Sequence, residues 1–278
     1  MQIKNIAVSH RNRTIDATYY KPNGEGSFPL VIFSHGYNGH KEDAALSAKY
    51  YAKSGIGAVC FTFCGGSTRD ASGFPTTEMT LFTEREDLLA VVDEVKKWPW
   101  VDSSQIYLFG FSQGGMVSAL AAEERCEEIH ALILLYPAFC IADNWNERFK
   151  KSEDIPDAEI LWDMTLGRKF FESIRDFRIK ERIGKFGGRV LLMHGTEDEV
   201  VGLEYAKWAS EKYADARLEL FHGEPHGFSE EGNRRMEAMA LYFIHECMAD
   251  RGVSGSNPSA QSGLRPVGRS RQEVFRKA

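Results

Sequence analysis

Short apolar runs alternate with segments of helical periodicity along most of this 278-residue chain. Runs that are apolar throughout are typical of strands buried on both faces, and helices between such strands favour parallel pairing. The chain is therefore expected to form one mostly parallel, eight-stranded α/β sheet with helices on both faces. The expected strands are residues 3–8 and 14–20, as a hairpin, then 30–33, 56–63, 106–109, 131–136, 190–193 and 218–221. The expected helices are residues 42–53, 79–98, 113–124, 203–213 and 230–248.

One interval breaks the alternation. About 50 residues, 139–188, separate the strand that ends near Tyr136 from the next strand, many more than an ordinary connection contains. We interpret this interval as a cap inserted into a single domain of residues 1–250. Residues 251–278 are rich in Ser, Gly, Pro and Arg and lack apolar periodicity, so they are expected to form a disordered basic tail.

Composition and charge exclude several classes of protein. The chain is 43% hydrophobic and 27% charged, as in ordinary globular proteins. Its longest mainly apolar run, residues 131–142, contains Pro137 and is too short to span a membrane. The net charge is −6 although the tail carries six basic residues against one glutamate, so the remainder is strongly acidic and poorly suited to bind nucleic acid.

Two further features predict a cytoplasmic protein. The N-terminus lacks the apolar core of a secretory signal. The five cysteines form no CxxC pair and lie mostly within apolar runs, which favours buried, reduced thiols over a disulfide framework.

The expected strand 106–109 runs directly into Gly110-Phe111-Ser112-Gln113-Gly114, and a helix follows. A GxSxG sequence between a strand and a helix is typical of a nucleophile elbow, a strained turn that projects the serine hydroxyl into solvent. Small residues on either side let the strand and the helix approach each other. Ser112 is therefore the candidate nucleophile.

A serine hydroxyl needs a base to accept its proton, and an elbow predicts that base on a loop after a later strand. His226 fits, because it follows strand 218–221 in a turn shaped by Gly223, Pro225 and Gly227. The other histidines considered end a strand (His222), lie in or beside packed elements (His130, His245) or precede the elbow (His10, His40). His222 and His226 have the spacing of a metal pair, but no carboxylate or cysteine set completes a site, so no metal is expected.

The base in turn needs an anion that holds its tautomer and stabilises the imidazolium. The chain order Ser, Asp, His places that acid between the elbow and His226. Asp198 is the candidate, in the loop after strand 190–193, which emerges at the same edge of the sheet. Its neighbours Glu197 and Glu199 stay open as alternatives.

Acyl transfer also requires hydrogen-bond donors for the developing oxyanion. One is expected to be the backbone N–H of Gln113, at the start of the helix after the nucleophile. The other is expected in the loop after strand 30–33, which reads SHGYNG, and we assign it to the N–H of Tyr37. This chemistry requires no cofactor.

The sequences HGYNG, GFSQGG, HGTEDEVV and EPHGF occur in this order and resemble the α/β-hydrolase superfamily across roughly residues 25–248. Within it the chain is most similar to bacterial feruloyl or cinnamoyl esterases. The resemblance implies the triad Ser112, Asp198 and His226, with Asp198 rather than its neighbours, and the same two oxyanion donors. It also implies a serine carboxylesterase that acts on hydroxycinnamoyl or other small aryl and acyl esters.

Two features bear on the substrate. Related esterases commonly carry a DFxGHGxS-like turn after the fourth strand, whereas residues 62–67 read TFCGGS and lack both the acid and the histidine. The triad is untouched by this difference. The cap is rich in aromatic residues, most of which are expected in its own core, and Trp145 and Trp162 are the candidates for substrate contact.

Other activities share these motifs. EPHGF after the elbow also resembles prolyl-oligopeptidase-like and acylaminoacyl peptidases and monoacylglycerol lipases, although no propeller-length region precedes the catalytic part. An acyltransferase would differ only in the acceptor that reaches the acyl-enzyme. A non-catalytic binding protein on this fold would be expected to have lost a triad member. The expected partner is a small-molecule ester, and no feature sets the oligomeric state.

Overall fold

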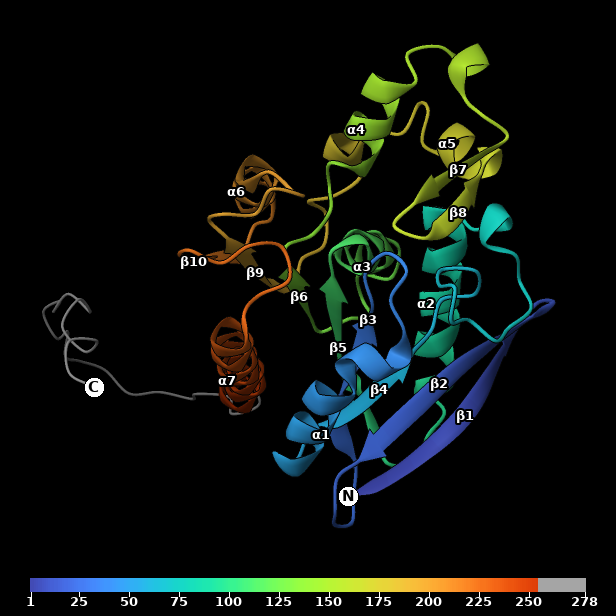
Figure 1. Ribbon diagram of the computed structural model, residues 1–278. Helices are drawn as coiled ribbons and strands as arrows, with labels where there is room; N and C mark the ends of the chain where they lie inside the picture. The colour runs from blue at the N-terminus through green and yellow to red at the C-terminus, as the bar shows by residue number, and fades with distance from the viewer. Residues whose placement is uncertain (255–278) are drawn as a thin grey trace, which may run out of the picture.

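The structure of the protein, a computed structural model, describes residues 1–254, with side chains described up to residue 249. Its centre is an eight-stranded sheet with the strand order β1-β2-β4-β3-β5-β6-β9-β10 (Figure 1). The strands are β1 (Gln2–His10), β2 (Arg13–Lys21), β3 (Phe28–Ser34), β4 (Gly57–Phe61), β5 (Val101–Phe111), β6 (Ala131–Leu135), β9 (Arg189–Gly195) and β10 (Ala216–Phe221). The strands from β4 to β10 in this order pair in parallel, whereas β1 and β2 form an antiparallel hairpin. The predicted sheet is confirmed.

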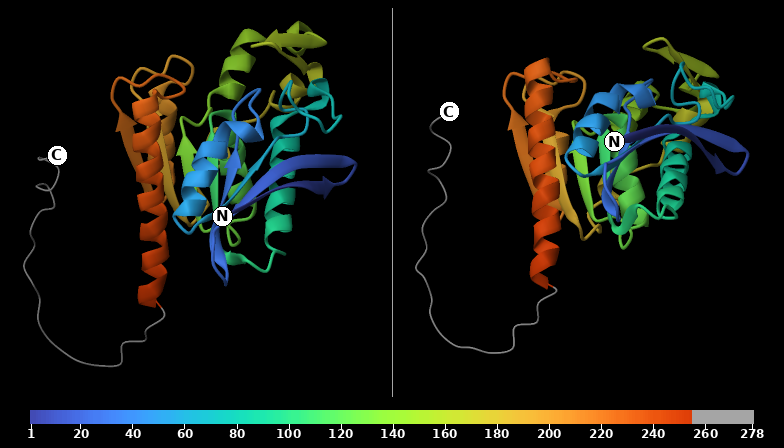
Figure 2. Two further views of the ribbon diagram at one scale, coloured as in Figure 1. Left: turned by 60° about the horizontal axis from the view of Figure 1, so that its bottom comes forward. Right: turned by 90° about the horizontal axis from the view of Figure 1, so that it is seen from below.

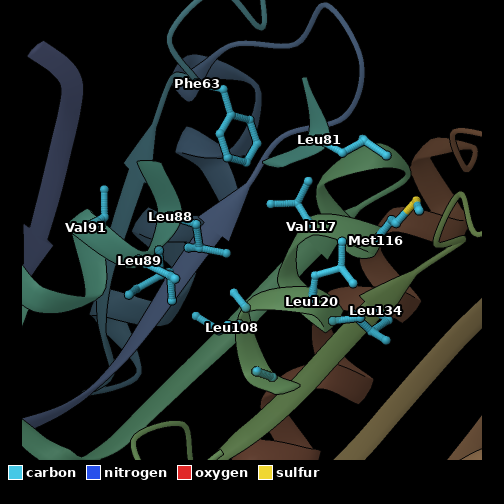
Figure 3. Packing of buried hydrophobic residues seen from close by; sticks show 14 of the residues in the cluster. Phe63, Leu81, Leu88, Leu89, Val91, Leu108, Met116, Val117, Leu120 and Leu134 are labelled. Carbon is cyan, nitrogen blue, oxygen red and sulfur yellow. The ribbon is translucent and has the colours of Figure 1, made fainter. Parts of the chain in front are cut away.

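Helices cover both faces of the sheet (Figures 1 and 2). On one face lie α2 (Leu81–Val95), α3 (Gln113–Glu124) and α6 (Leu203–Lys212), and on the other α1 (Ala45–Lys53) and α7 (Glu230–Ser254). Alternate residues of a strand serve alternate faces: Ile32 packs in the α2 and α3 cluster, and Phe33 in the α1 and α7 cluster. Figure 3 shows the first cluster, with Leu108 and Leu134 of the sheet beneath Leu120 of α3.

Capping side chains explain two helix boundaries that differ from expectation. The expected helix at 42–53 begins one residue early, as a 3₁₀ turn at Lys41–Ala44, because the His40 side chain accepts the N–H of Glu42 and caps the turn. α1 follows this turn after Ala44, whose backbone is not α-helical. Thr80 starts α2 two residues late, since its hydroxyl accepts the N–H of Thr83. At the other end of the chain, α7 continues six residues beyond its expected end. Residues 251–254, which were expected to belong to the disordered tail, are therefore helical, and the rest of the expected tail, 255–278, lies outside the described residues.

The cap lies over the carboxyl ends of the parallel strands (Figure 1). It contains α4 (Ile141–Arg148), a hairpin of β7 (Ala158–Leu161) and β8 (Met164–Gly167), and α5 (Arg168–Ser173). The hairpin was not expected. Its two turn residues, Trp162 and Asp163, both have positive φ, 42° and 62°, a conformation that is usually signalled by Asn-Gly or Asp-Gly.

Two composition-based expectations can be compared with the structure. All five cysteines are free, and four are buried as expected, but Cys126 is exposed. Within the described part of the chain, no helix is long and apolar enough to cross a membrane.

Candidate active site

Ser112 occupies a sharp turn between β5 and α3. Its φ of 50° lies in the left-handed region that non-glycine residues rarely adopt. The surrounding backbone holds it there: the Ser112 N–H donates to the Leu135 carbonyl at 3.0 Å, and the Ser112 carbonyl accepts the N–H groups of Gly115 and Ala138 at 2.9 and 3.0 Å. The turn therefore has the strained geometry expected of an elbow.

Glycine at position 114 lets α3 approach the loop after β3. A Cβ atom there would lie 2.3 Å from the carbonyl oxygens of both Ser34 and His35. Any side chain would push the helix away from this loop. The same approach brings the loop against the nucleophile, since a Cβ atom on Gly36 would lie 3.3 Å from Cβ of Ser112.

The structure brings the three predicted polar residues into one hydrogen-bond chain. Nε2 of His226 lies 3.0 Å from Oγ of Ser112, and Nδ1 of His226 lies 2.8 Å from Oδ2 of Asp198. An ionised carboxylate only accepts, so Nδ1 carries the proton and Nε2 is free to accept the Ser112 hydroxyl. This arrangement can raise the nucleophilicity of a serine.

Asp198 is the only one of the three candidate acids that contacts His226. Its Oδ1 accepts the N–H groups of Val200 and Val201 at 2.9 and 2.8 Å. Burial by itself raises the pKa of the carboxyl, but the hydrogen bonds from His226 and from the two amides outweigh it and lower the pKa. Asp198 is thus held as an anion. Glu197 and Glu199 are exposed.

A second histidine, which the sequence analysis did not single out, supports this loop. His194 on β9 is fully buried, and its Nε2 lies 2.9 Å from the Val201 carbonyl and 3.4 Å from Oδ2 of Asp198. Burial lowers the pKa of His194, so the ring is neutral. The His194-Gly195 pair at the end of β9 was the sequence feature that could have indicated this role.

The loop after β3 is anchored by His35. Its Nδ1–H donates to the Gly36 carbonyl at 2.7 Å, and its Nε2 accepts the N–H of Phe63 at 3.0 Å. Burial lowers the pKa of His35 to about 4, so both bonds are made by a neutral ring. Among the described residues, the backbone N–H groups of Tyr37 and Gln113 have no acceptor, which leaves both amides able to bind an oxyanion.

Side chains of this loop also hold the cap. The Tyr37 hydroxyl lies 3.1 Å from the Leu161 carbonyl and 3.2 Å from the Met164 carbonyl, and Nδ2 of Asn38 donates to the Trp162 carbonyl at 3.0 Å. The loop that carries the Tyr37 amide is therefore tied to the tip of the β7–β8 hairpin.

A cavity of about 360 Å³ lies between the cap and Ser112, and we call it the cap cavity. Its lining includes Tyr37, Ser112, Gln113 and Glu199 from the main domain, and Ile141, Trp145, Arg148, Trp162, Leu166 and Phe170 from the cap. Both tryptophans predicted to contact substrate thus line it. Most other cap aromatics, among them Phe149 and Phe171, pack behind it as the core of the cap, as expected.

A second pocket of about 380 Å³ also borders Ser112, and we call it the His226 pocket. Its lining includes His226 and the aromatic side chains Phe111, Tyr136 and Trp162. His226 does not line the cap cavity.

Within the described part of the chain, no group of three or more His, Cys, Asp or Glu residues could hold a metal ion.

The side chain of Gln113 contacts a buried carboxyl that the sequence analysis missed. Nε2 of Gln113 donates to Oε2 of Glu84 at 2.9 Å, and the two residues are 2% and 1% exposed. The signal was present in α2, because Glu84 lies one turn before Leu88 on the apolar face whose spacing predicted the helix.

Two family models match the chain. The model of the prolyl oligopeptidase family matches residues 82–251, and the model of acetyl xylan esterase matches residues 6–143.

Individual proteins are also similar to it. Esterase FrsA of Shigella boydii is 24% identical over 172 residues, which cover 62% of this chain and 39% of that protein, so the chain spans about two fifths of the length of this relative. The structure of Est1E from Butyrivibrio proteoclasticus with ferulic acid bound has a TM-score of 0.79 and 28% identity, covering 88% of this chain and 99% of that one. Mouse α/β-hydrolase domain-containing protein 10 has a TM-score of 0.71 at 19% identity over 89% and 99% of the two chains, and shares the fold. These findings confirm the α/β-hydrolase fold and the resemblance to esterases.

Proposed function

Because this chain belongs to the prolyl oligopeptidase family, we propose that it is a serine hydrolase of carboxylic esters, with hydroxycinnamoyl and other small aryl or acyl esters as substrates. The observation that carries the proposal is the hydrogen-bond chain from Asp198 through His226 to Ser112, which ends beside the cap cavity. It combines an activated serine with an enclosed site for an acyl group.

In the proposed acylation step, Oγ of Ser112 attacks the ester carbonyl while Nε2 of His226 takes its proton. The carbonyl oxygen becomes an oxyanion and accepts the N–H groups of Tyr37 and Gln113. Asp198 stabilises the imidazolium through Nδ1. When the tetrahedral intermediate collapses, the bond to the alcohol oxygen breaks, and His226 returns the proton to that oxygen.

The two pockets suit the two halves of an ester. The departing alcohol must receive its proton from His226, so it belongs on the side of the His226 pocket. The acyl group then lies in the cap cavity, which His226 does not border. Water enters from the vacated alcohol side and attacks the acyl carbon while His226 takes its proton. His226 then returns a proton to Oγ of Ser112 as the bond between Oγ and the acyl carbon breaks and the acid leaves.

Two observations favour an aryl acyl group. The cap cavity is lined by the rings of Trp145, Trp162 and Phe170, which offer flat apolar contacts to a ring. The relative Est1E, which has 28% identity, was solved with ferulic acid bound. A peptidase activity is the second candidate, because the prolyl oligopeptidase family model matches most of the chain.

The test compares hydrolysis of methyl ferulate, p-nitrophenyl acetate, a monoacylglycerol and a peptide p-nitroanilide by wild type and by Ser112→Ala. We expect preference for methyl ferulate and loss of turnover in the variant. The matched control is Ser118→Ala, which removes a buried hydroxyl from the same helix, away from both pockets, and should retain activity. Preference for the peptide would overturn the esterase assignment, and full activity of Ser112→Ala would overturn the mechanism.

A further inference from the structure

Glu84 is a buried carboxyl that the proposed mechanism leaves unused. It projects from α2 toward the start of α3, where Oε2 accepts the side-chain N–H of Gln113 at 2.9 Å. Within the described residues, no Lys, Arg or His lies within ion-pair distance of it. A carboxyl that is 1% exposed and has no cation is rare in proteins.

The surrounding backbone closes tightly over this pair. A Cβ atom on Gly66, in the turn after β4, would lie 2.8 Å from Oε1 of Glu84. Only glycine at this position leaves room for the carboxyl beside Gln113. The sequence thus maintains space for a polar group that contributes no ion pair to the fold.

We propose that Glu84 is a positioning residue of the active site, which acts as a neutral acid and fixes Gln113 so that its backbone N–H points at the oxyanion. The side chain and the N–H of Gln113 share one Cα atom in the first turn of α3, directly after Ser112. Anchoring one therefore limits the movement of the other. This inference rests on the proposed function.

The charge of Glu84 matters because of its location. An ionised carboxylate beside Gln113 would oppose the negative charge that develops on the substrate oxygen. Burial raises the pKa of Glu84 to about 8, the Gln113 hydrogen bond opposes this rise, and Asp87 on the same helix adds to it. Tyr37 also interacts electrostatically with Glu84, and it stays neutral because burial raises the pKa of its hydroxyl. The carboxyl thus stays neutral at neutral pH and ionises in the mildly alkaline range.

The first test measures kcat and KM for phenyl acetate, a substrate that does not itself titrate, in wild type, Glu84→Leu and Glu84→Gln. Glu84→Leu removes the acceptor of the Gln113 side chain, so kcat should fall about tenfold or more while KM changes less than about threefold. Glu84→Gln keeps the shape and the acceptor and should restore most of that loss. The double variant Glu84→Leu and Gln113→Met should lose no more kcat than Gln113→Met alone, because both substitutions remove the same hydrogen bond.

The second test is the pH profile of kcat between about pH 6 and about pH 9.5. Wild type should lose activity as the pH rises through the range near 8, and Glu84→Gln should lack this decline. The control is Asp87→Asn, which removes the other buried carboxyl of α2 without touching Gln113. It should retain the decline but move it to lower pH, because the charge of Asp87 contributes to the raised pKa of Glu84.

The outcomes separate this inference from the proposed function. If Ser112→Ala abolishes turnover but Glu84→Leu keeps the wild-type kcat, or Glu84→Gln keeps the alkaline decline, the positioning role is wrong. If Ser112→Ala itself keeps turnover, the proposed function fails first. Should Glu84→Leu not fold, the pH profile of Glu84→Gln still decides.

Discussion

The carboxylate of Asp198 lies 2.8 Å from Nδ1 of His226 with none of its side chain exposed, whereas 18% of the His226 side chain remains exposed. The buried carboxylate faces the Nδ1 side of the ring, where it fixes the tautomer of His226 and can stabilise the imidazolium. The half that faces Ser112 borders the His226 pocket, where an alcohol could receive a proton.

Asp198→Asn tests this relationship. The amide keeps the shape but favours the wrong imidazole tautomer, so kcat should fall roughly 10³- to 10⁴-fold, as in serine hydrolases that use a Ser-His-Asp triad. Steady-state kinetics on p-nitrophenyl acetate measure the loss. Glu197→Gln, an exposed neighbour, should stay within about twofold of wild type. Equal losses in the two variants would contradict the assignment of Asp198.

Tyr37→Phe separates the backbone role of this residue from its side-chain role. The N–H is kept, but the hydroxyl that bonds the Leu161 and Met164 carbonyls is lost, so the cap hairpin is less firmly held. We expect KM for an aryl ester to rise about threefold or more with kcat little changed, and stability to fall by about 1 kcal/mol. The exposed Tyr242→Phe is the control. A large drop in kcat at unchanged KM would contradict this division.

Gly114→Ala tests the contact between α3 and the loop after β3. The new methyl group would overlap two backbone oxygens, so the variant should lose about 3 kcal/mol or more of unfolding free energy and most of its activity. Gly187→Ala is the matched control, since a Cβ atom there meets nothing within 4 Å. Urea unfolding measures the stability of the two variants, and an ester hydrolysis assay measures their activity. Similar stability of the two variants would show that the tight approach is not needed.

Much of this architecture could be predicted because it depends on local chemistry. Residues 30–33 of β3 are all apolar, so the burial of this strand between two helical layers can be predicted from the sequence. The elbow around Ser112 and the turn around His226 carry glycines and proline that only particular backbone shapes require. The order of the motifs along the chain predicted that these loops lie close together, because the loops after parallel strands lie at the same edge of the sheet.

The features that escaped prediction depend on contacts between distant segments. The β7–β8 hairpin turns at Trp162 and Asp163, which are not typical of such a turn, and is held instead by Tyr37 and Asn38, more than 120 residues away in sequence. The pairing of Glu84 with Gln113 likewise joins two helices. A carboxyl on an apolar helix face signals a special environment, but not its partner.

Stability should also depend on Glu84. Its pKa in the folded protein, about 8, is above the 4.5 of an unperturbed glutamate, so the folded state holds a proton that the unfolded state releases. The contribution of Glu84 to the free energy of unfolding should therefore be highest below about pH 4.5 and should fall as the pH rises toward 8. Urea unfolding at several pH values should show a shallower fall for Glu84→Gln. Identical slopes would contradict a raised pKa.

Trp145→Ala tests the cap cavity. Removing this ring should lower kcat/KM for methyl ferulate about tenfold or more, while p-nitrophenyl acetate, with its small acyl group, should change less than about threefold. Ile160→Ala is the control, because Ile160 is exposed on the same cap and does not line the cavity. Equal effects on the two esters would contradict the placement of the acyl group.

The most direct test of the account is to trap the acyl-enzyme. Wild type and Ser112→Ala are quenched in acid during turnover of p-nitrophenyl acetate, and the site of acetylation is mapped by proteolysis and mass spectrometry. We predict one acetyl group on Ser112 in wild type and none at this peptide in the variant. Acetylation at another residue, or turnover without any acetylated intermediate, would contradict nucleophilic catalysis by Ser112.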